Sequence, residues 1–149
     1  MKWLRKNIIR PIKNLIRWFP IIWNDKDTDD YYIWCILSTK LKHQADFFDS
    51  DKAMSVGSEE RANRMRLCVR LIDLISNETY CSRYMDELDN KDYINKHPHA
   101  YKEVMKGENQ FFGNHNDVNI CMNIGYYMHN KARRILFRIL EQNGEDWWD

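Results

Sequence analysis

The apolar residues of this chain recur at helical spacing in every long segment, whereas the alternation typical of strands is almost absent. Near the amino end, apolar and basic side chains fall on opposite faces of a helix, the apolar ones within an arc of about 80°. The apolar face comprises Leu4, Ile8, Ile12, Leu15 and Phe19, and the basic face comprises Lys2, Lys6, Arg10, Lys13 and Arg17. Residues 1–19 therefore predict a basic amphipathic helix, which Pro11 should kink or divide and Pro20 should end.

Two further helices follow in the first half of the chain. One should begin after the acidic run of residues 25–30, because carboxylates suit the positive end of a helix dipole, and should end near Asp49. The next is predicted to begin with Ser58 as its N-cap, followed by acidic residues in the first turn. Its apolar residues, from Ala62 to Ile75, share one face.

The second half predicts a short helix and a long one. The short helix should span residues 98–106, with a proline in its first turn and a glycine after its end. The long helix should begin near Asn116 and end before Asn143, with an apolar face wide enough to pack on two neighbours. Residues 77–97 are polar and irregular and predict a loop region. The expected fold is all-α: a compact bundle of four to five helices in a single domain over residues 1–149.

Composition excludes several classes of protein. Hydrophobic residues make up 44% of the 149, which argues against disorder, and a net charge of +1 argues against a dedicated nucleic-acid coat. The longest apolar run, residues 31–37, is far below the ~18 residues that a membrane span needs. The four cysteines have no CxxC spacing, so free thiols in a reducing compartment are expected.

Motifs rich in aromatic and acidic residues bracket the chain: residues 14–27 read NLIRWFPIIWNDKD, and residues 147–149 read WWD. Together with four internal stretches, they resemble a family of small tailed-bacteriophage proteins. The internal stretches are residues 40–48 in outline, 56–60, 64–72 and 101–107. The chain departs from the family pattern at Thr28, where a Trp is expected, and in a shorter segment around residues 84–97. The resemblance implies a phage origin and action in an infected bacterium or a virion; it implies no activity and no catalytic residue.

One group of side chains predicts an anion-binding pocket. The candidates lie on one flank of each of two neighbouring helices and at a helix N-terminus, where backbone N–H groups bind anions. They are Lys40, His43, Phe47, Ser58, Arg61 and Arg64. If the two flanks face each other, they form a small basic pocket with an aromatic wall, suited to a phosphate or a nucleotide. The favoured alternative is that these charges lie at the edge of the core and pair with acidic side chains.

No metal site or cofactor is expected. Asp25, Asp27 and Asp29 resemble the start of a calcium loop, but Asp30 stands where glycine is required and Ile36 where glutamate is required. The His97-Pro98-His99 segment has no further ligand at a convincing spacing, and Pro98 is better explained as a helix start. No phosphate-binding glycine loop and no HExxH or GxSxG motif is present.

Two surfaces have alternative interpretations. The helix of residues 1–19 fits peripheral contact with a membrane surface, but docking on the bundle is favoured because the chain continues directly into the fold. The basic run from Lys131 to Arg138 is better explained as a solvated face than as a nucleic-acid site. At the carboxyl end, Trp147 or Trp148 should pack beside Trp18, Phe19 or Trp23, or into a neighbouring subunit, because two free indoles would expose a large apolar patch.

The resulting functional hypothesis is a non-enzymatic phage accessory protein that acts by binding in the host cytoplasm. Its expected partner is a host or phage protein, or an anionic small molecule such as a nucleotide signal, as in counter-defence. One alternative is a virion or assembly component that uses its aromatic ends to contact other chains. The sequence leaves the oligomeric state undecided. The other is a nucleotide-processing enzyme that uses the same pocket together with Asp29.

Overall fold

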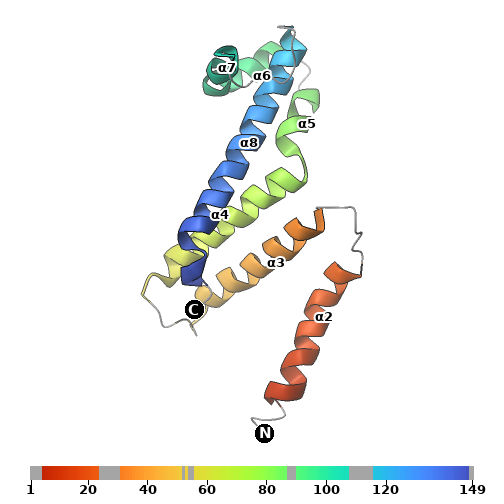
Figure 1. Cartoon of the computed structure of the whole chain (residues 1–149), viewed down its shortest axis with the longest axis vertical. Coiled ribbons are helices and arrows are strands. Elements are labelled where there is room, and N and C mark those ends of the chain that lie inside the picture. The colour runs from red at the N-terminus through yellow and green to blue at the C-terminus, as the bar shows by residue number, and fades with distance from the viewer. Residues whose placement is uncertain are drawn as a thin grey trace. The chain divides into compact units, whose positions relative to one another are not determined.

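The computed structural model describes residues 5–23, 31–51, 53, 56–86, 90–107 and 116–147, and every regular element in those ranges is helical (Figure 1). The elements are η1 (Arg5–Ile9), α2 (Arg10–Ile22), α3 (Tyr31–Phe48), α4 (Ser58–Ser76), α5 (Thr79–Asp86), α6 (Asn90–Lys96), α7 (Pro98–Met105), α8 (Asp117–Asn143) and η2 (Glu145–Trp147). The predicted all-α class is confirmed. The predicted number of four to five helices is too low, since the described residues form seven α-helices.

Contacts divide the chain into two compact units, residues 1–40 and residues 41–149, which we call the amino-terminal and carboxy-terminal units. The boundary falls inside α3. The sequence predicted a single domain. Because the contacts divide the chain into two units, each unit is described separately.

In the amino-terminal unit, a π-helical turn passes into α2 at Arg10, and Pro11 occupies the first turn of α2. The predicted division at Pro11 is confirmed. The predicted end at Pro20 is wrong, because α2 continues to Ile22 and the Trp23 N–H still donates to the Phe19 carbonyl over 2.9 Å. A proline so near a helix end removes one backbone hydrogen bond and leaves the final turn intact.

In the carboxy-terminal unit, α8 is the central element: α4 and α5 lie along it, and α6 and α7 pack near its amino-terminal end (Figure 1). The apolar face predicted for α4 is buried, as expected. Its buried residues are Ala62, Met65, Cys68, Val69, Leu71, Ile72 and Ile75. The predicted start of α8 is also confirmed, since the Asn116 side chain caps the helix by accepting from the Asn119 N–H over 2.8 Å.

The loop predicted for residues 77–97 is wrong, because α5 and α6 occupy most of it. These helices have eight and seven residues, so each offers about two turns and too few apolar positions for a periodic signal. Tyr93 attaches α6 to the core of the carboxy-terminal unit: it is 1% exposed and belongs to a buried cluster with Ala100, Val104 and Ile124.

The predicted N-cap of α4, Ser58, is off by one residue. Gly57 takes that position, in the left-handed conformation at φ +80°.

The Trp147 side chain is 3% exposed, and its backbone carbonyl accepts a hydrogen bond from Gln44 Nε2 over 3.0 Å. The prediction that a carboxyl-terminal indole is buried is therefore confirmed. Its hydrogen-bond partner, Gln44, lies in the second half of α3 and is not one of the aromatic residues named from the sequence. Trp148 lies outside the described residues.

Gly125 of α8 lies against the backbone of α5. A Cβ atom at this position would lie 2.6 Å from the Tyr80 carbonyl oxygen and 3.4 Å from the Cys81 Cα. Both atoms belong to the backbone of α5, which cannot move aside as a flexible side chain can. A residue without a side chain is therefore required for the two helices to pack at this distance.

We expect Gly125→Ala to destabilise the chain, although alanine is the better helix former. Overpacking costs about 1–3 kcal/mol, and the gain in helix propensity offsets about 1 kcal/mol of that. Thermal unfolding should therefore show a Tm lower by several degrees, and Gly125→Val should lower it further. An Ala variant more stable than the wild type would show that helix propensity dominates at this position and that α5 moves freely.

Candidate functional site

The six residues predicted to form a basic pocket lie on α3 and α4. Lys40 is exposed and is the last residue of the amino-terminal unit, whereas the other five belong to the carboxy-terminal unit. His43 and Ser58 are half-buried, and Phe47 is exposed. Two cavities of the carboxy-terminal unit, one beside Lys131 and one beside Arg66, are lined by none of the six.

The two arginines of this group contact neighbouring side chains. The Arg61 guanidinium lies 5.8 Å from the centroid of the Phe48 ring. Arg64 pairs with Glu60, one turn earlier on α4, over 2.6 Å, and also donates to the Asn143 side chain. These contacts support the alternative interpretation, in which the charges lie at the edge of the core. The basic pocket itself stays a prediction.

Two of the four cysteines, Cys68 and Cys81, have thiols of raised pKa. All four are free thiols, and Cys68 and Cys121 are buried. Burial raises the pKa of the Cys68 thiol to about 11. Burial, with a smaller contribution from Glu78, also raises the pKa of the Cys81 thiol. These two thiols stay protonated at neutral pH, and the thiol is a poor nucleophile and metal ligand. Over the part of the chain that the structure describes, no three His, Cys, Asp or Glu side chains come together as a metal site.

His129 is a half-buried imidazole on α8. Its Nδ1 atom is buried without a hydrogen-bond partner among the described residues. Burial lowers its pKa, the nearby Arg133 guanidinium lowers it further, and Glu78 opposes both effects in part. The folded chain therefore holds this side chain neutral at a pH where the unfolded chain protonates it.

We expect the free energy of unfolding to fall as the pH drops below about 6.5, the ordinary pKa of histidine. The unfolded state binds a proton there and the folded state does not, so the loss continues until the pH reaches the lowered folded pKa. A series of urea unfolding curves between pH 7.5 and 5.5 measures this effect. His129→Gln should flatten the pH dependence, because it removes the group whose pKa burial lowers. Equal pH dependence in the wild type and His129→Gln would contradict the assignment to His129.

The charge of the chain is strongly divided along its length. Residues 1–23 contain six Lys or Arg and no Asp or Glu, a net of +6. Residues 24–149 contain 17 basic and 22 acidic residues, a net of −5. The overall charge of +1 therefore conceals a basic amino-terminal segment on an acidic remainder.

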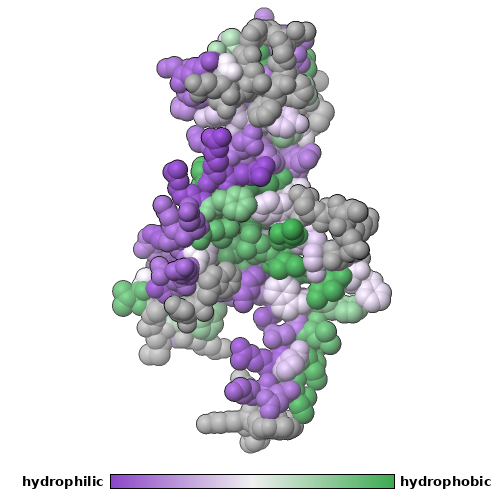
Figure 2. Space-filling model, in the orientation of Figure 1, coloured by the Kyte–Doolittle hydropathy of each residue, from purple (hydrophilic) through white to green (hydrophobic). Residues whose placement is uncertain are grey.

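The apolar face of α2 and its preceding turn is exposed. No side chain of α2 is buried. Docking of this helix on the bundle, which the sequence favoured, stays a prediction. Exposure ranges from 42% at Ile8 to 72% at Trp23, and Leu15 and Ile16 lie between these values. Figure 2 shows the apolar side chains as a green stripe along one side of α2 and the hydrophilic ones in purple along the other.

The basic face of α2 carries Arg10, Lys13 and Arg17, all exposed, and no acidic side chain in the described residues 5–23 compensates them. Near the end of α2, the rings of Phe19 and Trp23 contact each other with centroids 5.0 Å apart. A Trp at the edge of an apolar stripe flanked by basic residues is typical of helices that lie in a membrane interface. None of the described helices has the length and apolar content that crossing a bilayer requires.

Comparison of the chain with protein-family models, with curated proteins and with solved structures found no match in any of the three.

Proposed function

We propose that this chain is a peripheral membrane-binding protein that attaches to anionic lipid surfaces through α2. The observation that carries the proposal is the exposed apolar face of α2, which lies opposite Arg10, Lys13 and Arg17 with no acidic residue between them. In the bound state α2 lies in the plane of the interface. Its apolar side chains enter the boundary between headgroups and acyl chains, and its basic side chains contact lipid phosphates.

An anionic surface suits this helix better than a neutral one. Each Lys or Arg near such a surface contributes about 1 kcal/mol, so the three basic residues of α2 contribute about 3 kcal/mol. The remainder of the chain, with its net charge of −5, is repelled by the same surface. Attachment is therefore confined to the amino-terminal segment and leaves the carboxy-terminal unit free to act at the membrane.

The resemblance to tailed-phage proteins supports a location for this attachment. We propose the cytoplasmic face of the membrane in an infected bacterium, where anionic phospholipids are abundant. The chain then acts as a non-enzymatic accessory protein that brings its carboxy-terminal unit to that surface.

Co-sedimentation with lipid vesicles tests the proposal. The full chain should bind vesicles that contain phosphatidylglycerol and should bind phosphatidylcholine vesicles far more weakly. Binding to the anionic vesicles should weaken as salt rises, because salt screens exposed charges beyond about 10 Å at 0.1 M. Failure to bind phosphatidylglycerol vesicles, or equal binding to both lipids, would overturn the proposal.

A further inference from the structure

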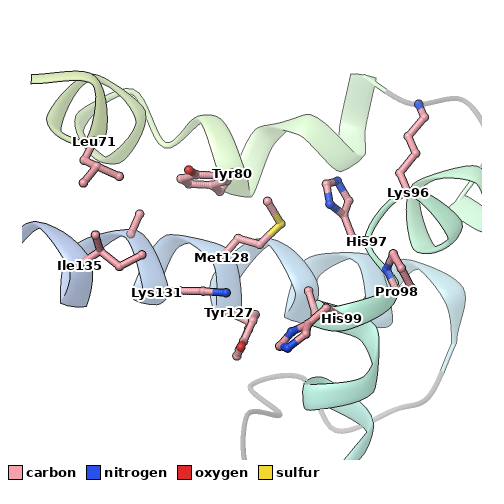
Figure 3. Close-up of a pocket in the computed structure, with 12 residues that line it drawn as sticks. Leu71, Tyr80, Lys96, His97, Pro98, His99, Tyr127, Met128, Lys131 and Ile135 are labelled. Atoms are coloured by element: carbon pink, nitrogen blue, oxygen red, sulfur yellow. The ribbon is translucent and has the colours of Figure 1, made fainter. Parts of the chain in front are cut away.

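A cavity of about 360 Å³ lies in the carboxy-terminal unit, where α8 meets α4, α5 and the junction of α6 with α7 (Figure 3). Its walls are largely apolar and aromatic: Leu71 and Ala132 are buried, and Tyr80, Tyr127 and Met128 are half-buried. Figure 3 shows Tyr80 and Met128 in the space between α5 and α8. The volume falls at the lower end of ligand pockets, and such walls suit a small molecule with a flat apolar body.

The charged side chains that line this cavity are basic. Lys96 and Lys131 line it together with two histidines, and none of the lining residues that the structure describes carries a carboxylate. Figure 3 shows the Lys131 ammonium directed toward the end of the cavity that holds Pro98 and His99, whereas the Lys96 amine is directed away. The nearest acidic group on α7, Glu103, is bound by Lys106 over 2.6 Å. Lys131 is therefore the cation placed to meet an anionic group at this end.

The amino end of α7 adds positive potential at the same place. Pro98 opens this eight-residue helix, its first turn contains no acidic residue, and the His97 side chain makes no capping hydrogen bond. The backbone N–H groups of His99 and Ala100 belong to this first turn, and both residues line the cavity. First-turn N–H groups have no partner within the helix, so they attract an anion.

We propose that this cavity binds a small organic anion with a flat apolar body. Its carboxylate or phosphate meets Lys131 and the amino end of α7, and its body lies against Tyr80, Tyr127 and Met128. The size and apolar character of the walls determine the flat apolar body of the ligand, and the basic end of the cavity determines its negative charge. Every residue involved belongs to the carboxy-terminal unit, so the proposal does not depend on membrane attachment.

Titration of the full chain with naphthalene-2-sulfonate, followed by amide chemical shifts and calorimetry, tests this site. The probe should bind with a dissociation constant near or below ~1 mM, as expected for a ligand of its size. Shift changes should cluster at residues 79–82, 97–100 and 127–135. Lys131→Gln and the uncharged 2-naphthol should each weaken binding by about tenfold or more, since a hydrogen bond to a charged group is lost.

The matched control is Arg133→Gln, which removes one exposed cation from another face of α8 and does not line the cavity. It should leave the dissociation constant within about twofold, as surface substitutions usually do. The proposal is overturned if the probe does not bind at millimolar concentration, or if the shift changes fall on α2. It is equally overturned if Lys131→Gln binds the probe as tightly as Arg133→Gln.

Discussion

We expect Trp147→Ala to lower the Tm of the chain by about 6–20 °C. The indole is 3% exposed, and truncating a buried Trp to Ala costs about 3–5 kcal/mol. In a chain of this size, each kcal/mol shifts Tm by roughly 2–4 °C. The hydrogen bond from Gln44 reaches the backbone carbonyl of Trp147, so the substitution removes the packing of the ring and leaves that donor in place. Thermal unfolding followed by circular dichroism measures the loss.

The matched control is Trp23→Ala, which truncates an indole that is 72% exposed. It should change the free energy of unfolding by no more than about 0.5 kcal/mol. Trp147→Phe, which keeps an aromatic ring of smaller volume, should melt between the wild type and Trp147→Ala. Equal melting of Trp147→Ala and Trp23→Ala would show that the carboxyl-terminal indole contributes nothing to the core.

The second large effect concerns the basic face of α2. Combined replacement of Arg10, Lys13 and Arg17 by Gln should weaken binding to phosphatidylglycerol vesicles by about 100-fold, because three contributions of about 1 kcal/mol each are lost. The glutamines preserve helix propensity and leave the apolar face unchanged. The Tm should stay close to that of the wild type, since no side chain of α2 is buried.

A second triple variant separates the position of these charges from their number. Arg133, Arg134 and Arg138 of α8 are also exposed, and their replacement by Gln removes the same net charge from the carboxy-terminal unit. This variant should bind vesicles within about threefold of the wild type, because it leaves the α2 contribution of about 1 kcal/mol per charge intact. Equal weakening by the two variants would contradict attachment through α2 and would indicate a general effect of net charge.

The sequence predicted the long helices well because each carries enough turns for its apolar face to repeat. The buried face of α4 and the cap of α8 at Asn116 follow from that repeat and from ordinary capping chemistry. The short helices α5 and α6 could not be predicted the same way. Their stability depends on tertiary contacts, such as the burial of Tyr93 and the close approach of α5 to Gly125, and local patterns do not encode those contacts.

The amphipathic character of residues 1–19 was also evident from the sequence, which favoured docking of this helix on the bundle over contact with a membrane surface. Helical periodicity shows that an apolar face exists and cannot show what covers it. The division of charge at residue 23 is a second feature of the sequence, with six basic and no acidic residues before it and a net charge of −5 after it.

The cavity beside Lys131 was beyond prediction for a different reason. Its lining comes from α4, α5, α6, α7 and α8 and runs from Leu71 to Ile135 in the sequence, and no spacing rule links these residues. The sequence instead grouped basic residues that share helix flanks near one another along the chain, and two of these, Arg61 and Arg64, contact Phe48 and Glu60. Shared flanks identify neighbours on a helix surface, whereas a cavity depends on how several helices pack.

Hydrogen–deuterium exchange of the full chain, with and without phosphatidylglycerol vesicles, tests membrane attachment most directly because it locates the contact by residue. Attachment through α2 predicts that amide exchange slows over residues 5–23 when vesicles are added, and that exchange across α4 and α8 is unchanged. Slower exchange in the carboxy-terminal unit with none in residues 5–23, or no change anywhere in the chain under conditions where vesicles are in excess, would contradict it.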